Sequence, residues 1–458
     1  MKKVLAFDLG SSSGRAIKGE YENGYLQCEE VHRFDNIPIW RGGHLCWDFE
    51  MLMKEVKTGI EKAGEIDSIG VDAWGADFGV LDEKGKLLAL PVHYRDRRTE
   101  GMIEKVQEEF SAKELFQMCG NQTYATNSLY QILALKEKEP ELWKQTAMIL
   151  HIPDLISYFL CGHAVCERTI ASTTQMLEPE SRRWCHKIFE RFQMPEEMFA
   201  PLTDTGTVIG EYQGIKVIAV AGHDTQSAGA AMTENPKDTT FLNIGTWSLL
   251  GIEREKPILS EEGYELGISN EQGPCGGIHC IMNITGTWLL QECRRFWEEN
   301  GEEYSYNELE GLAEEAGSTK GLFDPNAEDF SLAGNMPEKI KAYCRRTGQE
   351  EPETIGEVVR CIYESLAWKY STELKKLEKG IEKKIEKIQV LGGGARSEML
   401  CQMTADRCGR EVIAGPVEAT ALGNLVIQLH ALGEITDVET ARKAIRGTEQ
   451  FKHYLPRG

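Results

Sequence analysis

One short stretch of the sequence combines the residue types that proton abstraction requires. Gly222-His223-Asp224-Thr225 follows the apolar run 215–221, which is typical of a buried strand. Functional side chains of α/β folds lie just beyond the carboxyl ends of such strands. Asp224 is therefore a candidate general base that accepts a hydroxyl proton during phosphoryl transfer. The alternative is that Asp224 caps a helix expected over residues 225–231.

Two small-residue turns are candidate phosphate-binding loops. Residues 10–15 read Gly-Ser-Ser-Ser-Gly-Arg, and residues 245–248 read Gly-Thr-Trp-Ser, each between two strand-like runs. Such turns let backbone N–H groups approach phosphate oxygens, although ordinary tight hairpins use the same residues. Because the turns occupy matching places in the two halves of the chain, we expect them to clamp a phosphate chain. Asp8, just before the first turn, is a candidate magnesium ligand or a turn cap.

A third glycine-rich turn follows the strand-like run 387–391. Gly392-Gly393-Gly394 precedes a helical pattern, so both the backbone and the helix dipole favour contact with a nucleotide. The turn lacks the Gly-Lys-Ser/Thr ending of a P-loop and the spacing of the dinucleotide-binding motif, which disfavours P-loop kinases and Rossmann dehydrogenases. We expect it to contact adenine or ribose, and a plain tight turn is the alternative.

Two segments with aromatic residues are candidate sugar-binding elements. Residues 72–78 read Asp-Ala-Trp-Gly-Ala-Asp-Phe, and a ring beside glycine and carboxylates suits the C–H face and the hydroxyls of a polyol. The alternative is that Trp74 and Phe78 are core residues on either side of a turn. Residues 93–98 supply matched donors and acceptors, with a surface ion-pair cluster as the alternative.

The elements that must position these residues alternate between strands and helices. In the first half, strands are expected over 3–8, 16–21, 27–34 and 66–71, with a helix over 47–63. In the second half, strands are expected over 239–244, 249–252, 387–391 and 411–414, with helices over 354–375, 397–407 and 418–431. A strand, a glycine turn and a helix in repeated succession indicate an α/β fold.

The chain is too long for one hydrophobic core, and its second half repeats the opening of the first. Its 458 residues favour two domains. A strand, a turn of glycine and hydroxyl residues, and a second strand occur at the start and again from residue 239, which indicates a two-fold duplication. The polar segment 230–238 contains a proline and is the expected boundary. We therefore predict domains over residues 1–235 and 236–458.

The composition excludes several classes of function. A formal net charge of −22 repels phosphate backbones, so we expect no nucleic-acid partner. Apolar runs fall short of about twenty residues, so we expect no membrane span. Thirteen cysteines without a Cys-x-x-Cys pair fit a reduced, cytoplasmic protein. The nearest approach to a zinc motif has the wrong spacing, so we expect buried thiols and surface histidines at Cys161, His163, Cys166, Cys185 and His186.

Taken together, the motifs resemble those of the FGGY carbohydrate kinases, which belong to the actin/hexokinase/heat-shock ATPase superfamily. They run in order over essentially the whole chain. The motifs are Phe7 to Arg15, His32 to Phe34, Trp74 to Phe78, Tyr94 to Asp96, Gly222 to Thr225, Gly245 to Ser248, Asn283, Leu289 to Gln291, Leu391 to Gly394 and Ala414 to Ala419. After the glycine turn, Ala395-Arg396-Ser397 departs from relatives that often carry an amide residue, which leaves the backbone as the expected adenine contact.

The resemblance implies an α/β fold of two ribonuclease-H-like domains with ATP in the interdomain cleft. It implies ATP and Mg²⁺ as cofactors and Asp224 as the catalytic base. The implied nucleotide contacts are Ser11, Ser12, Ser13, Gly14, Arg15, Thr246, Gln291 and Gly393; the implied sugar contacts are Gly75, His223, Asp224, Thr225 and Asn283; and the expected metal ligands are Asp8 and Asp224.

The implied reaction transfers a phosphoryl group from ATP to L-rhamnulose and yields L-rhamnulose 1-phosphate. Because hydroxyl stereochemistry depends on few contacts, L-fuculose and D-xylulose are the alternative substrates. A non-kinase ATPase of the superfamily would need neither the polyol segment 72–78 nor Asp224. A catalytically silent sugar sensor would be expected to gain a DNA-binding segment or to lose Asp224. The expected partners are a small sugar and ATP, and the expected state is a monomer or a homodimer.

Overall fold

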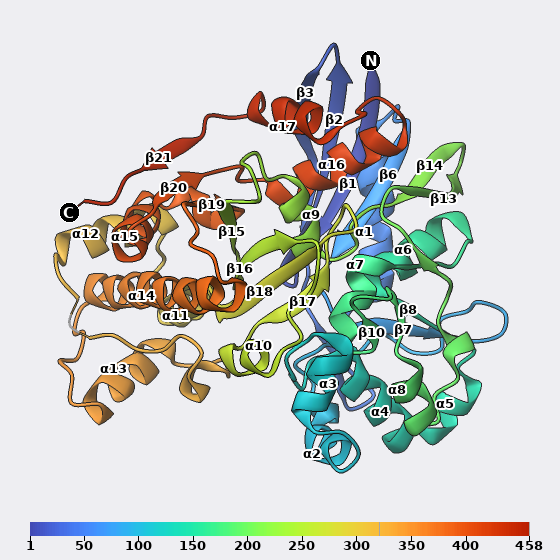
Figure 1. Cartoon of the computed structure of the whole chain (residues 1–458), viewed down its shortest axis with the longest axis horizontal. Helices are drawn as coiled ribbons and strands as arrows, with labels where there is room; N and C mark the ends of the chain where they lie inside the picture. Colours follow the sequence, from blue (N-terminus) through green and yellow to red (C-terminus); the bar gives the residue numbers. More distant parts are fainter. Residues whose placement is uncertain (320, 458) are drawn as a thin grey trace. The chain divides into compact units, whose positions relative to one another are not determined.

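The computed structural model describes residues 1–319 and 321–457, and the chain folds into two compact units (Figure 1). The first unit contains Met1–Thr233, Glu253–Cys280 and Ala419–Glu449. The second contains Glu234–Ile252, Ile281–Glu418 and Gln450–Gly458. Two segments from the later part of the sequence therefore belong to the first unit.

A six-stranded sheet forms the centre of the first unit, in the order β13-β14-β6-β1-β2-β3. Its strands are β1 (Lys2–Leu9), β2 (Ser13–Glu22), β3 (Tyr25–Asp35), β6 (Ser68–Ala73), β13 (Thr207–Tyr212) and β14 (Ile215–Ala219). Strands β1, β6 and β14 are parallel, whereas β2, β3 and β13 pair antiparallel with their neighbours. The carboxyl ends of the three parallel strands thus meet at one edge of the sheet.

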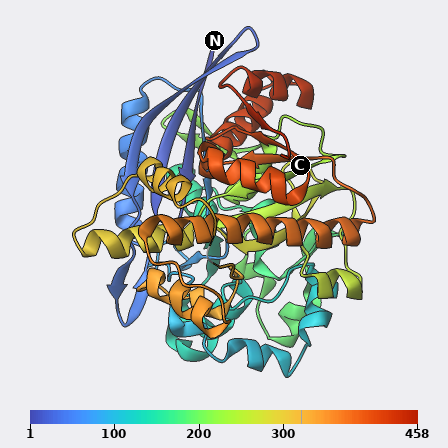
Figure 2. The same ribbon diagram turned by 90° about the vertical axis from the view of Figure 1, so that its left-hand side faces the viewer.

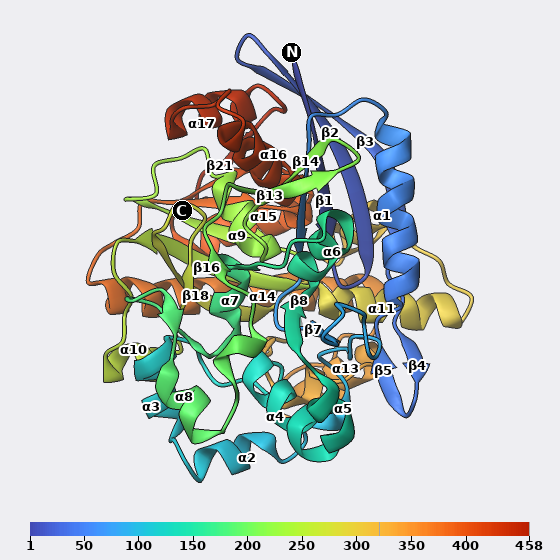
Figure 3. The same cartoon turned by 90° about the vertical axis from the view of Figure 1, so that its right-hand side faces the viewer.

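Helices cover both faces of this sheet, because successive side chains of β1 point to opposite sides. Phe7 faces α1 (Phe49–Ala63), where a Cβ on Gly59 would come within 2.7 Å of its ring. The other face is covered by α9 (Asp224–Ala230) and α16 (Ala419–Ala431) (Figure 3). The Gln428 amide donates to the Leu5 carbonyl at 3.0 Å. Asp8, one residue after Phe7, lies on the side of α16.

A helical subdomain and short connecting strands complete the first unit. The helical subdomain packs around a second hydrophobic core that includes Tyr130, Phe189 and Trp184. The remaining elements of this unit are β4 (Ile39–Arg41), β5 (His44–Cys46), β7 (Phe78–Leu81), η1 (Arg97–Thr99), α2 (Met102–Gln107), α3 (Ala112–Cys119), α4 (Ser128–Lys138), α5 (Pro140–Gln145), β8 (Met148–His151), α6 (Ile152–Cys161), β9 (Cys166–Glu167), α7 (Arg168–Ala171), η2 (Ser172–Thr174), β10 (Leu177–Glu178), β11 (Arg183–Trp184), α8 (His186–Arg191), η3 (Glu196–Met198), β12 (Leu202–Thr203), α10 (Glu261–Leu266), β17 (Ser269–Gln272) and α17 (Val438–Arg446).

The second sheet has the order β17-β18-β16-β15-β19-β20-β21. Its strands after β17 are β15 (Thr239–Ile244), β16 (Trp247–Arg254), β18 (Ile278–Thr285), β19 (Lys387–Leu391), β20 (Glu411–Ala414) and β21 (Lys452–Tyr454). The helices of the second unit are α11 (Trp288–Glu299), α12 (Tyr306–Glu315), η4 (Glu328–Phe330), α13 (Met336–Arg346), α14 (Ile355–Ile381), η5 (Gly393–Arg396) and α15 (Glu398–Cys408). Figure 2 shows the long helix α14 running across this unit.

The two sheets share one strand pattern. In each, a first strand pairs antiparallel with the next strand in the chain and parallel with a later one, which is followed by another parallel strand and an antiparallel edge strand. The order β3-β2-β1-β6-β14-β13 therefore matches β18-β16-β15-β19-β20-β21, except that the edge strand β13 precedes its neighbour in the chain whereas β21 follows it. The duplication that the sequence indicated is thus present as a repeated sheet topology.

The predicted strands and helices all occur, with small differences at their ends. The helix expected over 354–375 continues to Ile381, where Glu382 takes a left-handed conformation with φ 54° and ends it. Its first turn has a capping box between Thr354 and Glu357, which satisfies backbone donors at that end.

Neither a membrane span nor a disulfide is a feature of the described residues. None of the helices in residues 1–319 and 321–457 is both long and apolar enough to cross a bilayer. All thirteen cysteines are free. Cys344 and Cys361, whose proximity the sequence does not reveal, share a hydrogen bond between their thiols.

Candidate active site

The segment 222–225 lies at the carboxyl edge of the parallel strands, as its sequence predicted. The Gly222 carbonyl accepts a hydrogen bond from Ala73 N, the last residue of β6, at 2.9 Å. Helix α9 begins at Asp224 itself, with His223 in the N-cap position. Asp224 is therefore the first helical residue, and the alternative in which it caps the helix is wrong. Its Oδ1 accepts from Thr225 N at 2.6 Å and from the Thr225 hydroxyl at 3.2 Å.

Glu167, a buried glutamate outside the sequence motifs, binds the backbone of this segment. Glu167 Oε2 accepts from Gly222 N at 3.0 Å and from the Thr169 hydroxyl at 2.6 Å. The Thr169 hydroxyl oxygen in turn accepts from His223 N at 3.3 Å. Burial raises the pKa of Glu167, although these hydrogen bonds oppose the rise. Glu167 therefore fixes the backbone from which Asp224 projects.

His223 lies between two carboxylates. Its Nδ1 is 2.8 Å from Glu271 Oε2, and its Nε2 is 3.5 Å from Asp224 Oδ1. Burial alone would lower the pKa of His223, but the carboxylates, Glu271 above all, raise it to about 9. Burial raises the pKa of Asp224, and Asp8 adds to the rise, whereas the charge of His223 opposes it. His223 thus favours the ionised form of Asp224, which is the form that accepts a proton.

Three carboxylates gather at this edge of the first sheet. Asp8 and Asp72 are directly opposite each other on the parallel strands β1 and β6, so their side chains share one face. Burial raises the pKa of Asp72 well above its usual range, and Asp8 and Asp224 add to the rise. Asp72 Oδ2 accepts from the Asn424 amide at 2.6 Å, whereas its Oδ1 is buried and has no hydrogen-bond partner among the described residues.

The carboxylates of Asp8, Asp72 and Asp224 are oxygen ligands of the kind that Mg²⁺ binds. Mg²⁺ prefers carboxylate and water oxygens. The unpartnered oxygen of Asp72 is an acceptor that a cation or its water would satisfy. Asp8 is engaged by Arg15, whose guanidinium lies 2.5 Å from Asp8 Oδ2. The residues present therefore fit a hydrated divalent cation, and Asp72 is a candidate that the sequence reading did not include.

The first small-residue turn joins β1 to β2 and is held by one side chain. Gly10 N donates to the Ser13 carbonyl at 2.9 Å, and the Asn36 amide donates to the Gly10 carbonyl at 2.9 Å. A Cβ on Gly14 would lie 2.2 Å from the ring of Phe34, so only glycine fits there. Ser11 and Ser13 are half-buried and Ser12 is exposed, so the predicted phosphate-binding turn is open to a ligand.

The segment 74–77 forms a strained turn around a buried carboxylate. Asp77 Oδ2 accepts from Trp47 Nε1 at 2.7 Å and from Trp74 Nε1 at 3.0 Å. Burial raises the pKa of Asp77 to about 6, although these indole donors oppose the rise. Trp74 is buried, which agrees with the alternative that it is a core residue, whereas Gly75 is half-buried. Ala76 has φ +75°, a conformation that costs energy for a residue with a side chain.

Residues 93–98 do not form a surface ion-pair cluster. His93 stacks on Trp47 with ring centroids 4.2 Å apart, and Asp96 accepts from Leu45 N at 2.8 Å. Arg98 is buried and donates to the Gln131 side chain at 2.7 Å. The alternative reading of this segment is wrong, because tertiary packing encloses these three side chains.

In the second unit, two of the predicted nucleotide contacts come together. The Thr246 hydroxyl donates to Gln291 Oε1 at 3.3 Å. Gly393 opens η5, and a Cβ there would meet no other atom of the described residues within 4 Å, whereas the adjacent Gly394 lies against Ile244. Asn283 lies on β18, where its carbonyl accepts from the Asn326 amide at 3.0 Å.

The histidine and cysteine residues that the sequence grouped do not form one cluster. Cys166 instead lies near His151 and Asp154, with ligand-type atoms within 4.8 Å of one another. Each of these three has a partner in the chain: His151 Nδ1 is 3.8 Å from Cys166 Sγ, and Asp154 accepts from Glu167 N. Cys185 is buried and His186 is exposed, as expected.

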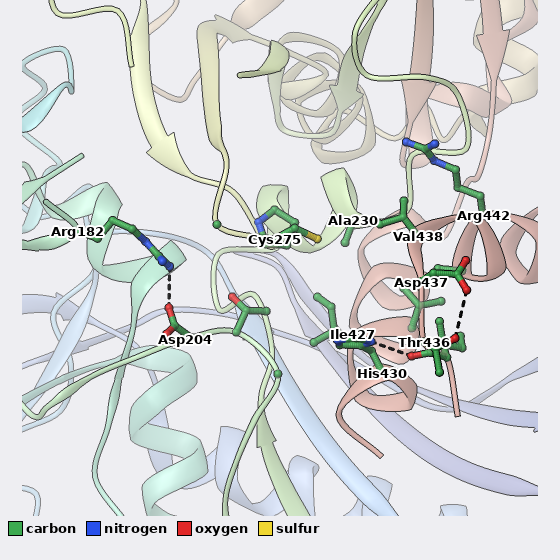
Figure 4. A pocket seen from close by; sticks show the side chains of 17 residues that line it. Arg182, Asp204, Ala230, Cys275, Ile427, His430, Thr436, Asp437, Val438 and Arg442 are labelled. Carbon is green, nitrogen blue, oxygen red and sulfur yellow. Dashed lines mark hydrogen bonds and ion pairs between the residues drawn. The ribbon is translucent and has the colours of Figure 1, made fainter. Parts of the chain in front are cut away.

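A separate pocket of about 420 Å³ lies in the first unit (Figure 4). Ala230 at the end of α9 and Ile427 on α16 form part of its apolar wall. Arg182 on one side pairs with Asp204 at 2.7 Å, and Asp437 is engaged with Thr436 on the other. None of its 17 lining residues is a predicted site residue. The pocket therefore does not belong to the group around Asp224.

The chain matches known carbohydrate kinases over nearly its whole length. The N-terminal domain of the FGGY family of carbohydrate kinases matches residues 3–229, and the C-terminal domain of that family matches residues 241–432. The rhamnulokinase of Halalkalibacterium halodurans is 39% identical, and the match covers 99% of each chain. That of Bacteroides thetaiotaomicron is 40% identical, over 99% of this chain and 96% of the relative.

Solved structures with the same fold are more distant in sequence. The ligand-bound xylulose kinase of Lactobacillus acidophilus has a TM-score of 0.78 at 17% identity, over 100% of this chain and 94% of that one. The glycerol kinase of Plasmodium falciparum with ADP has a TM-score of 0.78 at 16% identity, over 99% and 94%. These likenesses confirm the expected two-domain α/β fold. By both of its domains and by the identity to its relatives, this chain belongs to the FGGY family of carbohydrate kinases.

Proposed function

We propose that this protein is an ATP-dependent kinase that phosphorylates L-rhamnulose and releases L-rhamnulose 1-phosphate and ADP. The observation that carries the proposal is the placement of Asp224. Its carboxylate is fixed at the first residue of α9, beside His223, at the edge where parallel strands end. The choice of ketose is supported by the rhamnulokinases that this chain resembles over nearly its full length.

We further propose that residues 1–235 form a domain with the base and most of the sugar contacts, and that residues 236–458 form a nucleotide-binding domain. Asn283 of the second domain and the turn 11–15 of the first are proposed contacts that depart from this division. The proposed sugar contacts are Gly75, His223, Asp224, Thr225 and Asn283. The proposed nucleotide contacts are Ser11, Ser12, Ser13, Gly14, Arg15, Thr246, Gln291 and Gly393. The hydrogen bond between Thr246 and Gln291 supports a shared role for these two residues.

In the proposed reaction, Asp224 accepts the proton of the sugar hydroxyl while the sugar oxygen bonds to the terminal phosphorus of ATP. The bond from that phosphorus to the bridging oxygen of ADP breaks, and ADP leaves with the electron pair. The chain fixes the base through Glu167, His223 and Thr225, so little reorganisation is needed when the sugar binds. Asp8, Asp72 and Asp224 are the residues that would hold Mg²⁺, which neutralises phosphate charge when bound.

A cytoplasmic location and a monomeric or homodimeric state are also proposed. The location is supported by thirteen free cysteines, most of them buried, which suit a reducing compartment.

A substrate panel tests the proposed function. Purified protein with ATP and Mg²⁺ is given L-rhamnulose, L-fuculose, D-xylulose or no sugar, and ADP release is followed by a coupled assay. We expect kcat/KM to be largest for L-rhamnulose, and we expect EDTA to abolish turnover.

The other outcomes of the panel point elsewhere. A larger kcat/KM with L-fuculose or D-xylulose would reassign the substrate within the family. ADP release that no ketose stimulates would favour an ATPase without sugar-kinase activity.

A further inference from the structure

Glu271 is a buried carboxylate that contacts His223, just before Asp224 in the sequence, and Gln226, two residues after it. Only 6% of its surface is exposed. Its Oε2 lies 2.8 Å from His223 Nδ1 and accepts from the Gln226 amide at 2.8 Å. Glu271 thus joins β17 to the start of α9.

The strand that carries Glu271 is held firmly on both sides. The neighbouring residue Gln272 donates its N–H to the Ser172 hydroxyl at 3.0 Å. On the other side, the Asn270 amide donates to the Gly120 carbonyl at 3.0 Å. Since β17 is fixed in this way, the carboxylate of Glu271 is a fixed acceptor and not a mobile one.

The contact with Glu271 decides how the ring of His223 is turned. A histidine whose Nδ1–H is bound to a carboxylate has a defined ring orientation and presents Nε2 in one direction. Here Nε2 is directed to Asp224 Oδ1, 3.5 Å away. The backbone of His223 is fixed independently, because its N–H is bound by Thr169. The orientation of the ring, and not the placement of the backbone, is therefore what Glu271 controls.

We propose that Glu271 is a positioning residue for phosphoryl transfer, which holds His223 so that Nε2–H faces the Asp224 carboxylate and the sugar hydroxyl beside it. This inference rests on the proposed sugar-kinase function. It adds to that function a residue outside the His-Asp-Thr motif, 47 positions after Asp224 in the sequence.

The alternative is a purely structural role, in which Glu271 only fastens β17 to α9. The two roles differ in what substitutions do. A positioning role needs an acceptor for Nδ1–H, so Glu271→Gln retains part of it and Glu271→Met removes it. A structural role depends on packing and burial, for which methionine is at least as suitable as a neutral amide.

Steady-state kinetics of the two variants test the proposal. We expect kcat/KM for the ketose to fall about 100-fold in Glu271→Met, because a ring displaced by about 1 Å costs that much. In Glu271→Gln we expect a loss of less than about tenfold, since a neutral acceptor remains. KM for ATP should change little in either variant. Glu253→Gln, a partly buried glutamate of the same unit, is the matched control and should behave as the wild type.

The state of His223 can be followed without any sugar. In the wild type, a histidine Nδ1–H bound to a carboxylate gives a strongly deshielded proton resonance, which His223→Asn identifies by its loss. We expect this resonance to disappear in Glu271→Met and to persist in Glu253→Gln. Thermal unfolding of each variant shows whether the fold is retained.

The two readouts separate the failure of the inference from the failure of the function. If the wild type phosphorylates no ketose but the resonance depends on Glu271, the proposed function is wrong and the positioning of His223 stands. If Glu271→Met keeps the resonance or wild-type kcat/KM, the inference is wrong. Equal kinetic losses in the Gln and Met variants, or equal increases in KM for both substrates, would also overturn it.

Discussion

Three features of its surroundings hold the carboxylate of Asp224. It accepts from the backbone of the next residue, faces the positively polarised end of α9, and lies beside His223. These contacts favour its ionised form, while burial and Asp8 oppose it. Burial is the largest of these effects and raises the pKa of Asp224, while His223 and Thr225 oppose the rise, so the ionised form that can accept a proton is favoured by specific contacts against burial.

The role of Asp224 is tested by Asp224→Asn. Asparagine keeps an acceptor for Thr225 and nearly the same shape, but it cannot accept the proton. We expect kcat to fall by about 10² to 10⁴, the usual contribution of a positioned base. The affinity for ATP, measured by calorimetry, should stay close to that of the wild type.

Asp437→Asn is the matched control for this substitution. Asp437 caps α17, and asparagine caps a helix as well as aspartate does. This variant should keep wild-type kcat. If Asp224→Asn also kept a kcat near that of the wild type, Asp224 would not be the base.

At the scale of elements, the position of Asp224 depends on the packing of α9 against α16. The two helices approach so closely at Gly423 that a Cβ there would lie 1.7 Å from the Ser227 carbonyl oxygen. The same helix α16 provides Asn424, which binds Asp72, and Gln428, whose Oε1 accepts from the Ser68 hydroxyl. The contact between α9 and α16 therefore aligns Asp224 with the carboxylates of the sheet.

Gly423→Ala should disturb this alignment. The added methyl group collides with the backbone of α9, which cannot give way as a flexible side chain would. We expect a loss of about 1 to 3 kcal/mol in the free energy of unfolding, measured by urea titration, together with a lower kcat.

A helical glycine without close neighbours provides the comparison. A methyl group added to Gly311 in α12 would meet no atom of the described residues within 4 Å, so Gly311→Ala should stabilise the protein by about 0.5 to 1 kcal/mol. Unchanged stability and kcat in Gly423→Ala would mean that the two helices separate without consequence for the site.

At the scale of the whole molecule, the first unit is built from three separate pieces of the chain. Its last piece, residues 419–449, contributes α16 and α17. Most of α16 is buried, ten of its thirteen residues, and Gln428 donates to the carbonyl of Leu5 in the first strand. The first 233 residues therefore lack α16, one of the two helices that cover one face of their own sheet.

Removal of residues 419–458 should consequently unfold the first unit. We expect the chain that ends at Glu418 to be insoluble or to lack a cooperative thermal transition, because an apolar sheet face and the carboxylate of Asp72 lose their cover. A chain that ends at Glu449 loses only the edge strand β21 and should remain folded. Circular dichroism and size-exclusion chromatography measure the difference. A shorter chain with native helix content and a sharp transition would contradict the dependence on α16.

Much of this protein could be predicted from local sequence. The strands around Asp8 and Asn243, the turns between them and the helices after the glycine turns all follow from periodicity and turn residues, which act over a few positions. Gly222 to Thr225 could be assigned to the end of a strand for the same reason. The helix ends could not be placed to the residue, because they depend on caps such as the left-handed Glu382.

The sequence by itself determined the alternation of strands and helices, the duplicated order and the identity of the candidate base, because each is written in neighbouring residues. Only the tertiary structure decided which distant residues hold that base. Glu167 and Glu271 carry no motif, and their roles arise from burial beside Gly222 and His223. The unpartnered oxygen of Asp72 and the return of residues 419–449 to the first unit are likewise products of packing. Contacts between residues far apart in the chain have no local signature, so they become visible only when the chain is folded.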